Sequence, residues 1–374
     1  SVMEFPPCSP CGTVLGSLPI MLSQPLPMTD SRPSTNLLAL DWSGMCAFIA
    51  RLEWRPYRAK QILRWLYQRR ISNIEEMTDL SLSNRAILQS IATIPRSTNI
   101  QMREAIDGTK KFLIELSDHL QVESVLIPER DRLTLCVSTQ VGCTLDCSFC
   151  LTGKMGLKRN LKAHEIVEQV LIVQDQCGED HPITSLVFMG MGEPLANLEE
   201  VSDAIVRLTD QAWGVGISPR RITLSTAGLA PRLKEVVPLG VNLAISLNVT
   251  TNEQRNVLMP AINKLHPLSQ LLRACREYPL KTGRHLTFEY VLLAGVNDSL
   301  DDAKRLPKLL HGIPCKINLI PFNEFTGSEY KRPSEEISGQ FQMVLRRAGY
   351  FVFVRKSRGR DVLGACGQLG DLQV

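Results

Sequence analysis

The feature that most constrains the fold is a regular alternation of strand-like and helix-like segments that begins at Leu133. Short apolar runs of strand length recur six times, and segments with helical periodicity separate them, such as Leu198–Leu208 and Ser299–Leu310. Repeated βα units form a parallel sheet, which here is expected to curl or close toward a barrel, and function gathers in the loops after the carboxyl ends of the strands. The expected strands are Leu133–Ser138, Ser185–Met189, Arg221–Ser225, Asn242–Leu247, His285–Leu292 and Lys316–Ile320.

The chain ahead of this repeat divides by composition. A length of 374 residues suits one large α/β domain with one smaller domain. The first segment is rich in proline and serine without periodicity, which predicts disorder, and its Cys8 and Cys11 have no partner pair, which favours an incidental C-x2-C. Alternation at Lys111–Glu115 and Val122–Ile127 predicts a short hairpin. The predicted division is a disordered leader over 1–35, a helical accessory domain over 36–100, a β-hairpin layer over 101–128 and the α/β core over 129–374.

Composition excludes several classes of protein. No apolar run approaches the ~18 to 20 residues of a membrane span. The mildly apolar piece Gly12–Leu22 lacks a preceding basic region and contains Pro19, which argues against a signal peptide. Eleven cysteines without a secretion signal indicate a reducing cytoplasm, so we expect a cytoplasmic protein. The net charge of +4 is modest, so an anionic partner must be met by a local patch.

Three cysteines follow the first expected strand with the spacing C-x3-C-x2-C: Cys143, Cys147 and Cys150. This spacing can hold three irons of a 4Fe-4S cluster and leave the fourth iron open, whereas electron-transfer clusters usually have every iron covered by protein. An open metal position exists so that another molecule can bind there. For this spacing the expected molecule is S-adenosylmethionine, bound through its amino and carboxylate groups and cleaved reductively to an adenosyl radical.

Three other kinds of site could contain these cysteines. A structural zinc site needs a fourth ligand, and the only nearby candidate, His164, falls in an expected amphipathic helix over Lys162–Gln176. Ordinary buried thiols are a second possibility, because free cysteine packs as a small hydrophobe. A disulfide framework is the weakest of the three, since a chain of this length needs no staples and has an odd number of cysteines. The position after a strand favours the cluster.

The expected helical domain contains a basic and aromatic stretch. Six basic residues and no acidic one lie between Arg55 and Arg70, and four aromatic residues are interleaved with them. Such a mixture suits phosphate contact and base stacking, although a small helical bundle with core aromatics and a solvated basic face has the same pattern. The residues are Arg55, Arg58, Lys60, Arg64, Arg69 and Arg70, with Trp54, Tyr57, Trp65 and Tyr67.

Polar residues follow the other expected strands. The second strand leads into Gly190–Pro194, where glycines allow close backbone approach to a ligand and Glu193 can accept hydrogen bonds from an ammonium group or a ribose. Each polar residue alone is more often a cap or turn residue, but together they describe a polar cofactor rim. The further rim residues are Ser225, Thr226, Ser246, Asn248, Asn318 and Asn323.

Two more cysteines stand out. Cys136 lies on the first strand, seven residues before Cys143, and Cys366 lies in a glycine-flanked loop near the end of the chain. An accessible thiolate is a good nucleophile toward a sulfonium methyl group. Two plainer interpretations stay open: Cys136 as a buried strand thiol, and Cys366 as an ordinary residue of the tail. Basic residues that would attract phosphate precede Cys366: Arg346, Arg347, Arg355, Lys356, Arg358 and Arg360.

Taken together, these motifs resemble the radical S-adenosylmethionine RNA methyltransferases that act on adenine C2 in 23S rRNA, the bacterial dual-specificity type that also accepts tRNA. The resemblance runs from about Leu37 to Leu369. It implies a radical S-adenosylmethionine fold, a partial (βα)6 barrel with a helical accessory domain that engages RNA. The motifs that carry it are Thr134–Ser138, Gly142–Cys150, Gly190–Pro194, Cys315–Pro321, Arg358-Gly359 and Ala365–Gln368.

The resemblance also implies a role for each site residue. Cys366 takes a methyl group from one S-adenosylmethionine, and a second molecule on the cluster gives the radical that activates this methyl group, so two are used per turnover. Cys136 resolves the resulting protein–RNA adduct by forming a disulfide with Cys366, and Glu123 accepts a proton. The positions that match the family's cofactor-binding residues are Gly192, Glu193, Ser225, Ser246, Leu247, Asn248 and Asn323.

Partners and departures follow from the same resemblance. It implies 23S rRNA and tRNA as substrates, an electron donor such as flavodoxin, no membrane and a monomer. Leu145 stands where the family often has Met, a volume-conserving change. Asn248 stands where it usually has His, so a role that needs imidazole is in doubt.

Three rival functions share parts of this pattern. An adenine-C8 methyltransferase would use the same thiols. An iron–sulfur protein that binds RNA or transfers electrons without methylation would not need Cys366. A zinc-stabilised RNA-binding module would be colourless after anaerobic purification, whereas the enzyme would be brown.

Overall fold

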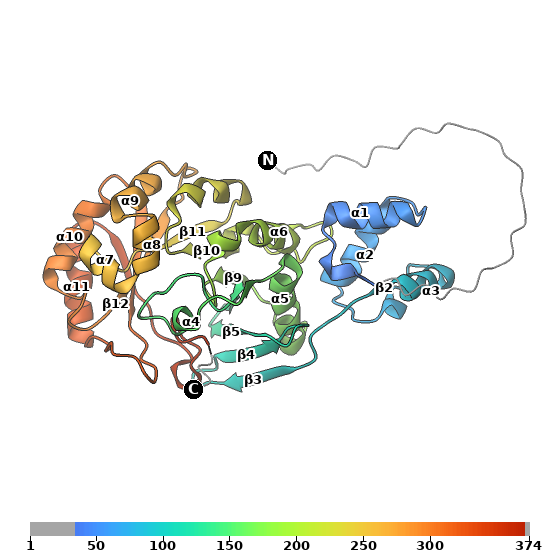
Figure 1. Ribbon diagram of the computed structural model, residues 1–374, viewed down its shortest axis with the longest axis horizontal. Helices are drawn as coiled ribbons and strands as arrows, with labels where there is room; N and C mark the ends of the chain where they lie inside the picture. The colour runs from blue at the N-terminus through green and yellow to red at the C-terminus, as the bar shows by residue number, and fades with distance from the viewer. Residues whose placement is uncertain (1–33, 371–374) are drawn as a thin grey trace, which may run out of the picture. The chain divides into compact units, whose positions relative to one another are not determined.

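The computed structural model describes residues 34–370, which form two compact units, one ending at Pro95 and the other starting at Arg96 (Figure 1). Cys8, Cys11 and all but the last two residues of the expected leader lie outside the described residues. No helix in the described part of the chain is long and apolar enough to cross a membrane.

The first unit is a small helical bundle closed by a two-stranded parallel ladder. Asp41 begins its first helix, because its side chain accepts a hydrogen bond from the Gly44 N–H at 2.6 Å. Ile62, Leu63 and Leu66 are fully buried on one face of the second helix. The elements are β1 (Thr35–Asn36), α1 (Trp42–Arg51), α2 (Tyr57–Tyr67), α3 (Leu82–Ile91) and β2 (Ala92–Thr93).

The second unit is built on one ten-stranded sheet with the order β14-β13-β12-β11-β10-β9-β6-β5-β4-β3. From β6 to β14 all neighbours are parallel, and β3, β4 and β5 continue the same sheet with antiparallel pairing. The antiparallel strands are β3 (Ile100–Glu104), β4 (Lys110–Glu115) and β5 (Gln121–Glu129). The parallel strands are β6 (Arg132–Cys136), β9 (Ser185–Phe188), β10 (Ile222–Thr226), β11 (Asn242–Ser246), β12 (Leu286–Leu292), β13 (Cys315–Pro321) and β14 (Phe351–Val354).

The six strands predicted from the apolar runs are therefore confirmed, with boundaries that agree within two residues. The strand β14 was not predicted. It lies at the edge of the sheet, and Phe351 and Phe353 on its outer face are exposed, so only Val352 gives the burial that a strand pattern normally reflects.

Helices connect the parallel strands (Figure 1). The three helices predicted in this unit are α5, α6 and α10, each within one residue of the expected bounds. The helices of the second unit are α4 (Leu151–Lys154), α5 (Ala163–Cys177), α6 (Leu198–Thr209), α7 (Asn252–Leu258), α8 (Pro260–Leu265), α9 (Leu268–Arg276), α10 (Leu300–Leu310) and α11 (Glu335–Arg347).

This topology places the site. The carboxyl ends of β6, β9, β10, β11, β12 and β13 share one edge of the sheet because these strands are parallel. Cys136, Thr226 and Ser246 are the last residues of their strands, and the cysteine loop follows β6. The order and direction of the strands thus bring the predicted site residues to one edge of the sheet.

Candidate functional site

The cysteine loop is closed at its base by a two-residue antiparallel ladder, β7 (Gln140–Val141) with β8 (Arg159–Asn160). The buried side chain of Gln140 links this loop to the next one. Its Oε1 accepts hydrogen bonds from the N–H of Thr144 at 3.2 Å and from the N–H of Glu193 at 2.9 Å. Sequence reasoning missed Gln140, because nothing in its local pattern shows which backbone groups its amide meets.

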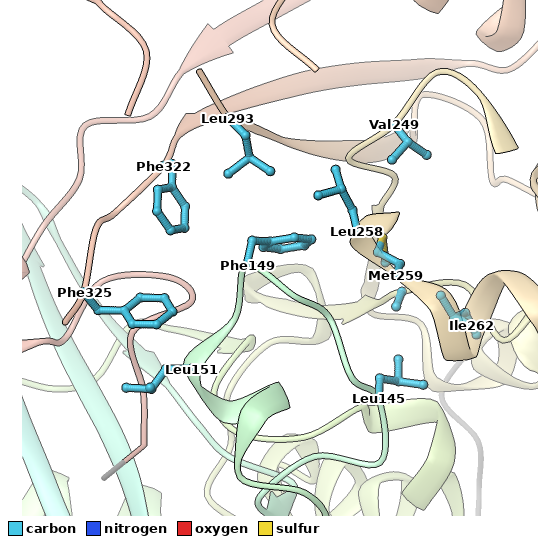
Figure 2. Close-up of a cluster of buried hydrophobic side chains, with 11 residues drawn as sticks. Leu145, Phe149, Leu151, Val249, Leu258, Met259, Ile262, Leu293, Phe322 and Phe325 are labelled. Atoms are coloured by element: carbon cyan, nitrogen blue, oxygen red, sulfur yellow. The ribbon is translucent and has the colours of Figure 1, made fainter. Parts of the chain in front are cut away.

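Apolar packing fixes the rest of the loop (Figure 2). Phe149, between the last two cysteines, is buried among Leu258, Leu293 and Phe322. The N–H of Ser148 donates to the Leu258 carbonyl at 3.0 Å, which ties the loop to the end of α7. The three cysteines pack against this apolar cluster, so the loop is held by hydrophobic burial and backbone hydrogen bonds.

Cys143, Cys147 and Cys150 line a single cavity of about 160 Å³. The cysteines therefore come together with the polar rim, as the motif spacing and the strand order predicted. Leu247 does not reach the cavity: its side chain is fully buried, and only its backbone lies between two lining residues. Other predicted residues that line the cavity are Gly192, Glu193, Ser225, Thr226, Ser246, Asn248 and Cys366.

Burial dominates the electrostatics of the three thiols. It raises the pKa of Cys143 to about 12, raises the pKa of Cys147 well above the usual value, and raises the pKa of Cys150. Thiols this reluctant to ionise alone become thiolates when a metal supplies positive charge. Three such donors around one cavity fit an iron–sulfur cluster, whose cysteines bind different irons. In residues 34–370 no three His, Cys, Asp or Glu side chains are grouped to hold a single metal ion.

The Gly190–Pro194 loop follows β9. Gly192 has a φ of +102°, and a Cβ there would lie 2.6 Å from the Cβ of Gln140, so the glycine permits close packing of the two loops. The carboxylate of Glu193 accepts the Leu195 N–H at 3.0 Å and the Ala227 N–H at 2.7 Å. Burial raises the pKa of Glu193, and these hydrogen bonds act in the opposite direction.

The ends of β10 and β11 carry smaller polar groups that also line the cavity. The hydroxyls of Ser225 and Ser246 are 3.3 Å apart. Asn248 has a φ of +58°, a left-handed conformation that asparagine adopts more readily than most residues, and its Oδ1 accepts the Val291 N–H at 2.9 Å. The asparagine that departs from the family pattern is therefore built into the backbone of the loop after β11.

Glu289 on β12 also lines the thiol cavity and was missed by the sequence analysis. Its Oε1 accepts a hydrogen bond from Asn318 at 2.9 Å, whereas its Oε2 has no partner within residues 34–370. Burial raises the pKa of this carboxyl. A charged residue inside the apolar string of β12 was the signal that could have identified it.

A second cavity, of about 260 Å³, is lined by both of the other cysteines that the sequence singled out, Cys136 and Cys366. Cys136 and Asn323 line it together with the basic residues Arg355, Lys356 and Arg358. Cys366 lines both this cavity and the thiol cavity. The Asn323 side chain donates to the Cys366 carbonyl at 3.1 Å and so holds the cysteine between the two spaces.

Arg355 and the two cysteines of this second cavity interact electrostatically. The Cys366 thiolate is the main cause of a raised pKa for Arg355, and Glu289 and Cys136 also contribute. Burial, followed by the charge of Cys366, raises the pKa of Cys136 to about 12. Both cysteines are free thiols in this structure, so the disulfide implied by the resemblance is not formed here.

Glu123 lies outside the residues that line either cavity. Its Oε1 pairs with the Lys111 ammonium at 2.8 Å, and both side chains are buried. Its Oε2 accepts the Gly370 N–H at 2.8 Å, which connects β5 to the segment that follows Cys366. In this arrangement the carboxylate is fully engaged in holding the structure together.

Some side chains of the basic and aromatic stretch in the first unit are exposed, and others are used in the fold. Tyr57 is 55% exposed, and the Arg58 guanidinium lies 4.9 Å from its ring centre. Tyr67 is buried in the core, and the indole N–H of Trp65 donates to Asp79 at 2.6 Å. The exposed basic residues that remain available to an anionic partner are Arg55, Lys60, Arg64 and Arg69.

Known families match both units. Residues 35–94 match the Ribosomal RNA large subunit methyltransferase N-terminal domain, and residues 137–306 match the Radical SAM superfamily. The chain is 51% identical over 315 residues to the dual-specificity RNA methyltransferase RlmN of Geobacter sulfurreducens, which covers 84% of this chain and 86% of that protein. It is 48% identical over 318 residues to the protein of the same name from Desulfosudis oleivorans, which covers 84% and 85%. The chain belongs to the RlmN family.

A solved structure of a related protein agrees with this assignment. A radical SAM methyltransferase from Sphaerobacter thermophilus superposes with a TM-score of 0.84 at 40% identity, over 90% of this chain and 99% of that one. The predicted family and the predicted radical S-adenosylmethionine fold are therefore confirmed.

Replacement of Gly142 tests how tightly the cysteine loop is built. Gly142 has a φ of +79°, and a Cβ there would lie 1.8 Å from the Gly156 carbonyl oxygen. We expect Gly142→Ala to cost roughly 2–5 kcal/mol, from left-handed strain and overpacking together. Gly156→Ala is the matched control: its φ is +67° with open space around it, so only about 1 kcal/mol of strain is expected. Calorimetric melting of both variants measures the difference, and equal melting temperatures would contradict this packing.

The raised pKa of Cys136 predicts its reactivity with pH. Only the thiolate is alkylated, so with a pKa of about 12 the iodoacetamide labelling rate of Cys136 in the folded protein should rise about tenfold per pH unit between pH 7 and 10. The same cysteine in urea has an ordinary pKa, and its rate should level off near pH 9. Peptide mass spectrometry measures both rates. A plateau by pH 9 in the folded protein would show that burial does not raise this pKa.

Proposed function

We propose that this protein is a radical S-adenosylmethionine RNA methyltransferase that methylates C2 of an adenine in 23S rRNA and also in tRNA. Its relatives are named dual-specificity RNA methyltransferases, and the family assignment supports the same enzyme class here. The observation that carries the proposal is the position of Cys366, a residue that lines both the three-cysteine cavity and the cavity of Cys136.

The residues around the thiol cavity have separate tasks in this proposal. Cys143, Cys147 and Cys150 would hold a 4Fe-4S cluster, and the polar rim would hold S-adenosylmethionine: Gly192, Glu193, Ser225, Ser246, Leu247, Asn248 and Asn323. When bound, the cluster and S-adenosylmethionine supply an adenosyl radical. Leu247 could contribute only through its backbone, and Asn323 only from the side of the second cavity.

Adenine C2 cannot take a methyl group by direct transfer, because it is an electron-poor carbon with no nucleophilicity. Cys366 would act first as the nucleophile: its thiolate bonds to the methyl carbon of one S-adenosylmethionine as the sulfonium C–S bond breaks, and S-adenosylhomocysteine leaves. The S-methyl group would then give one hydrogen atom to the adenosyl radical, which leaves as 5′-deoxyadenosine, and the methylene carbon would bond to C2 of the base. The adduct would lose one electron, which the oxidised cluster can accept, and the C2 proton, and so regain its aromatic ring. A second S-adenosylmethionine is thus used per turnover.

Cys136 would release the product. Its thiolate attacks the Cys366 sulfur, an S–S bond forms, and the bond from sulfur to the methylene carbon breaks. The electron pair stays on carbon, which takes up a proton to become the methyl group. The resulting disulfide is reduced by two electrons from a donor such as flavodoxin. The positive charge of Arg355 in the same cavity lowers the pKa of Cys136, against the larger effect of burial.

Glu123 is the proposed acceptor of the C2 proton. Its contacts with Lys111 and with the Gly370 N–H would have to open for the carboxylate to reach a base. Movement of the segment after Cys366 would remove the second of these contacts. RNA would be met by the exposed basic residues near Tyr57 and by Arg355, Lys356 and Arg358. We propose that the enzyme acts as a monomer.

Product analysis of a Cys366 variant tests this function. After anaerobic reconstitution with iron and sulfide, the wild type should be brown and convert ribosomal RNA fragments to 2-methyladenosine, measured by mass spectrometry of nucleosides. Cys366→Ala should lower product at least about a hundredfold, because the methyl carrier is lost. Cys177→Ala is the control, a partly exposed cysteine outside both cavities.

Three results would contradict the proposal in different ways. Formation of 8-methyladenosine alone would identify the C8 activity. Undiminished product with Cys366→Ala would exclude the methyl carrier. A colourless protein that contains zinc would indicate a structural metal site.

A further inference from the structure

A buried arginine next to the thiol cavity has no role in the reaction described above. Arg255 lies on α7 and its side chain is fully buried. Its Nη2 donates to the Ala227 carbonyl at 2.9 Å. Its Nε and Nη1 have no hydrogen-bond partner in the part of the chain that the structure describes.

Such a group is unfavourable unless something compensates its charge. A buried cation whose N–H groups are unsatisfied costs several kcal/mol, and proteins normally pair it with a carboxylate. Arg207, which is also buried, is paired in this way: its Nη2 lies 2.6 Å from the Oδ2 of Asp203. Within residues 34–370, no carboxylate forms an ion pair with Arg255.

The position of Arg255 points to the missing negative charge. The Arg255 carbonyl accepts the N–H of Met259, a residue that lines the thiol cavity. Leu258, on the same helix, bonds to Ser148 of the cysteine loop, and Ala227, which accepts from Arg255, lines the cavity as well. Arg255 itself is absent from the cavity lining, so its guanidinium lies in the wall and not in the space for a ligand.

A charged Cys147 thiolate acts on Arg255 more strongly than that of Cys275, and both raise the pKa of the guanidinium. Burial outweighs them and lowers the pKa of Arg255 to about 10, so the guanidinium is charged at neutral pH. The positive charge is thus present beside a cysteine that the proposed function makes a cluster ligand.

We propose that Arg255 is an internal counter-charge for the iron–sulfur cluster and raises its reduction potential. The inference rests on the proposed function, because it requires the cluster at Cys143, Cys147 and Cys150. A cluster with three thiolate ligands is anionic and gains one further negative charge on reduction. A buried cation therefore stabilises the reduced form more than the oxidised form, and net charge and hydrogen bonds near the sulfurs are known determinants of such potentials.

Redox titration followed by electron paramagnetic resonance tests this proposal, since it reports only on molecules that carry a cluster. Arg255→Met and Arg255→Gln remove the charge, and Arg255→Lys retains it. At a fixed solution potential, the ratio of reduced to oxidised cluster should fall at least about tenfold in the neutral variants, a shift of about 59 mV for one electron. The Lys variant should stay closer to the wild type. Arg207→Met is the control for loss of a buried arginine elsewhere, and its cluster should titrate like the wild type.

Each outcome decides between a charge and a merely structural role. Neutral variants that keep a cluster and titrate at the wild-type potential would overturn the proposal. If the neutral variants lose the cluster, retention by Arg255→Lys supports the requirement for charge, whereas loss in that variant too would overturn it. A wild type without any cluster would instead refute the proposed function.

Discussion

The site depends on the burial of Phe149. This side chain enters an apolar cluster formed by loops and helices from distant parts of the sequence, and it carries Cys147 and Cys150 with it on either side. Removal of a buried phenylalanine typically costs about 3–5 kcal/mol. The three thiols are therefore positioned by hydrophobic packing before any metal binds. In the proposed cluster the open iron has no protein ligand, so this packing would fix the geometry of the other three.

Cations lie next to both cavities. Burial keeps the three thiols neutral when no metal compensates them, and the uncompensated guanidinium of Arg255 lies in the adjacent wall. On the other side, Arg355 faces Cys136 and Cys366 in the second cavity. Each cation interacts electrostatically with cysteine: Arg255 with Cys147, and Arg355 with Cys136 and Cys366. Cys366 joins the two spaces because its loop is anchored at Asn323.

Much of this arrangement was accessible from the sequence. Apolar runs and helical periodicity are local, so the six inner strands and the helices α5, α6 and α10 were predicted, and the parallel order then brought the cysteines and polar rim to one edge. The edge strand β14 was missed because Phe351 and Phe353 are exposed and only Val352 is buried. Gln140 and Arg255 were missed for a different reason: their roles depend on backbone and charge partners far away in sequence. The engagement of Glu123 by Lys111 is equally a tertiary property that no motif encodes.

In the proposed function the three cysteines hold a cluster with one iron open to S-adenosylmethionine. Electron–nuclear double resonance on the reduced protein tests this binding directly, with S-adenosylmethionine labelled with ¹⁵N at the amino group and ¹⁷O at the carboxylate. We expect hyperfine coupling of both labels to the cluster spin, because both groups would bind the open iron. A cluster that forms fully but shows no coupling to either label would contradict this mode of binding.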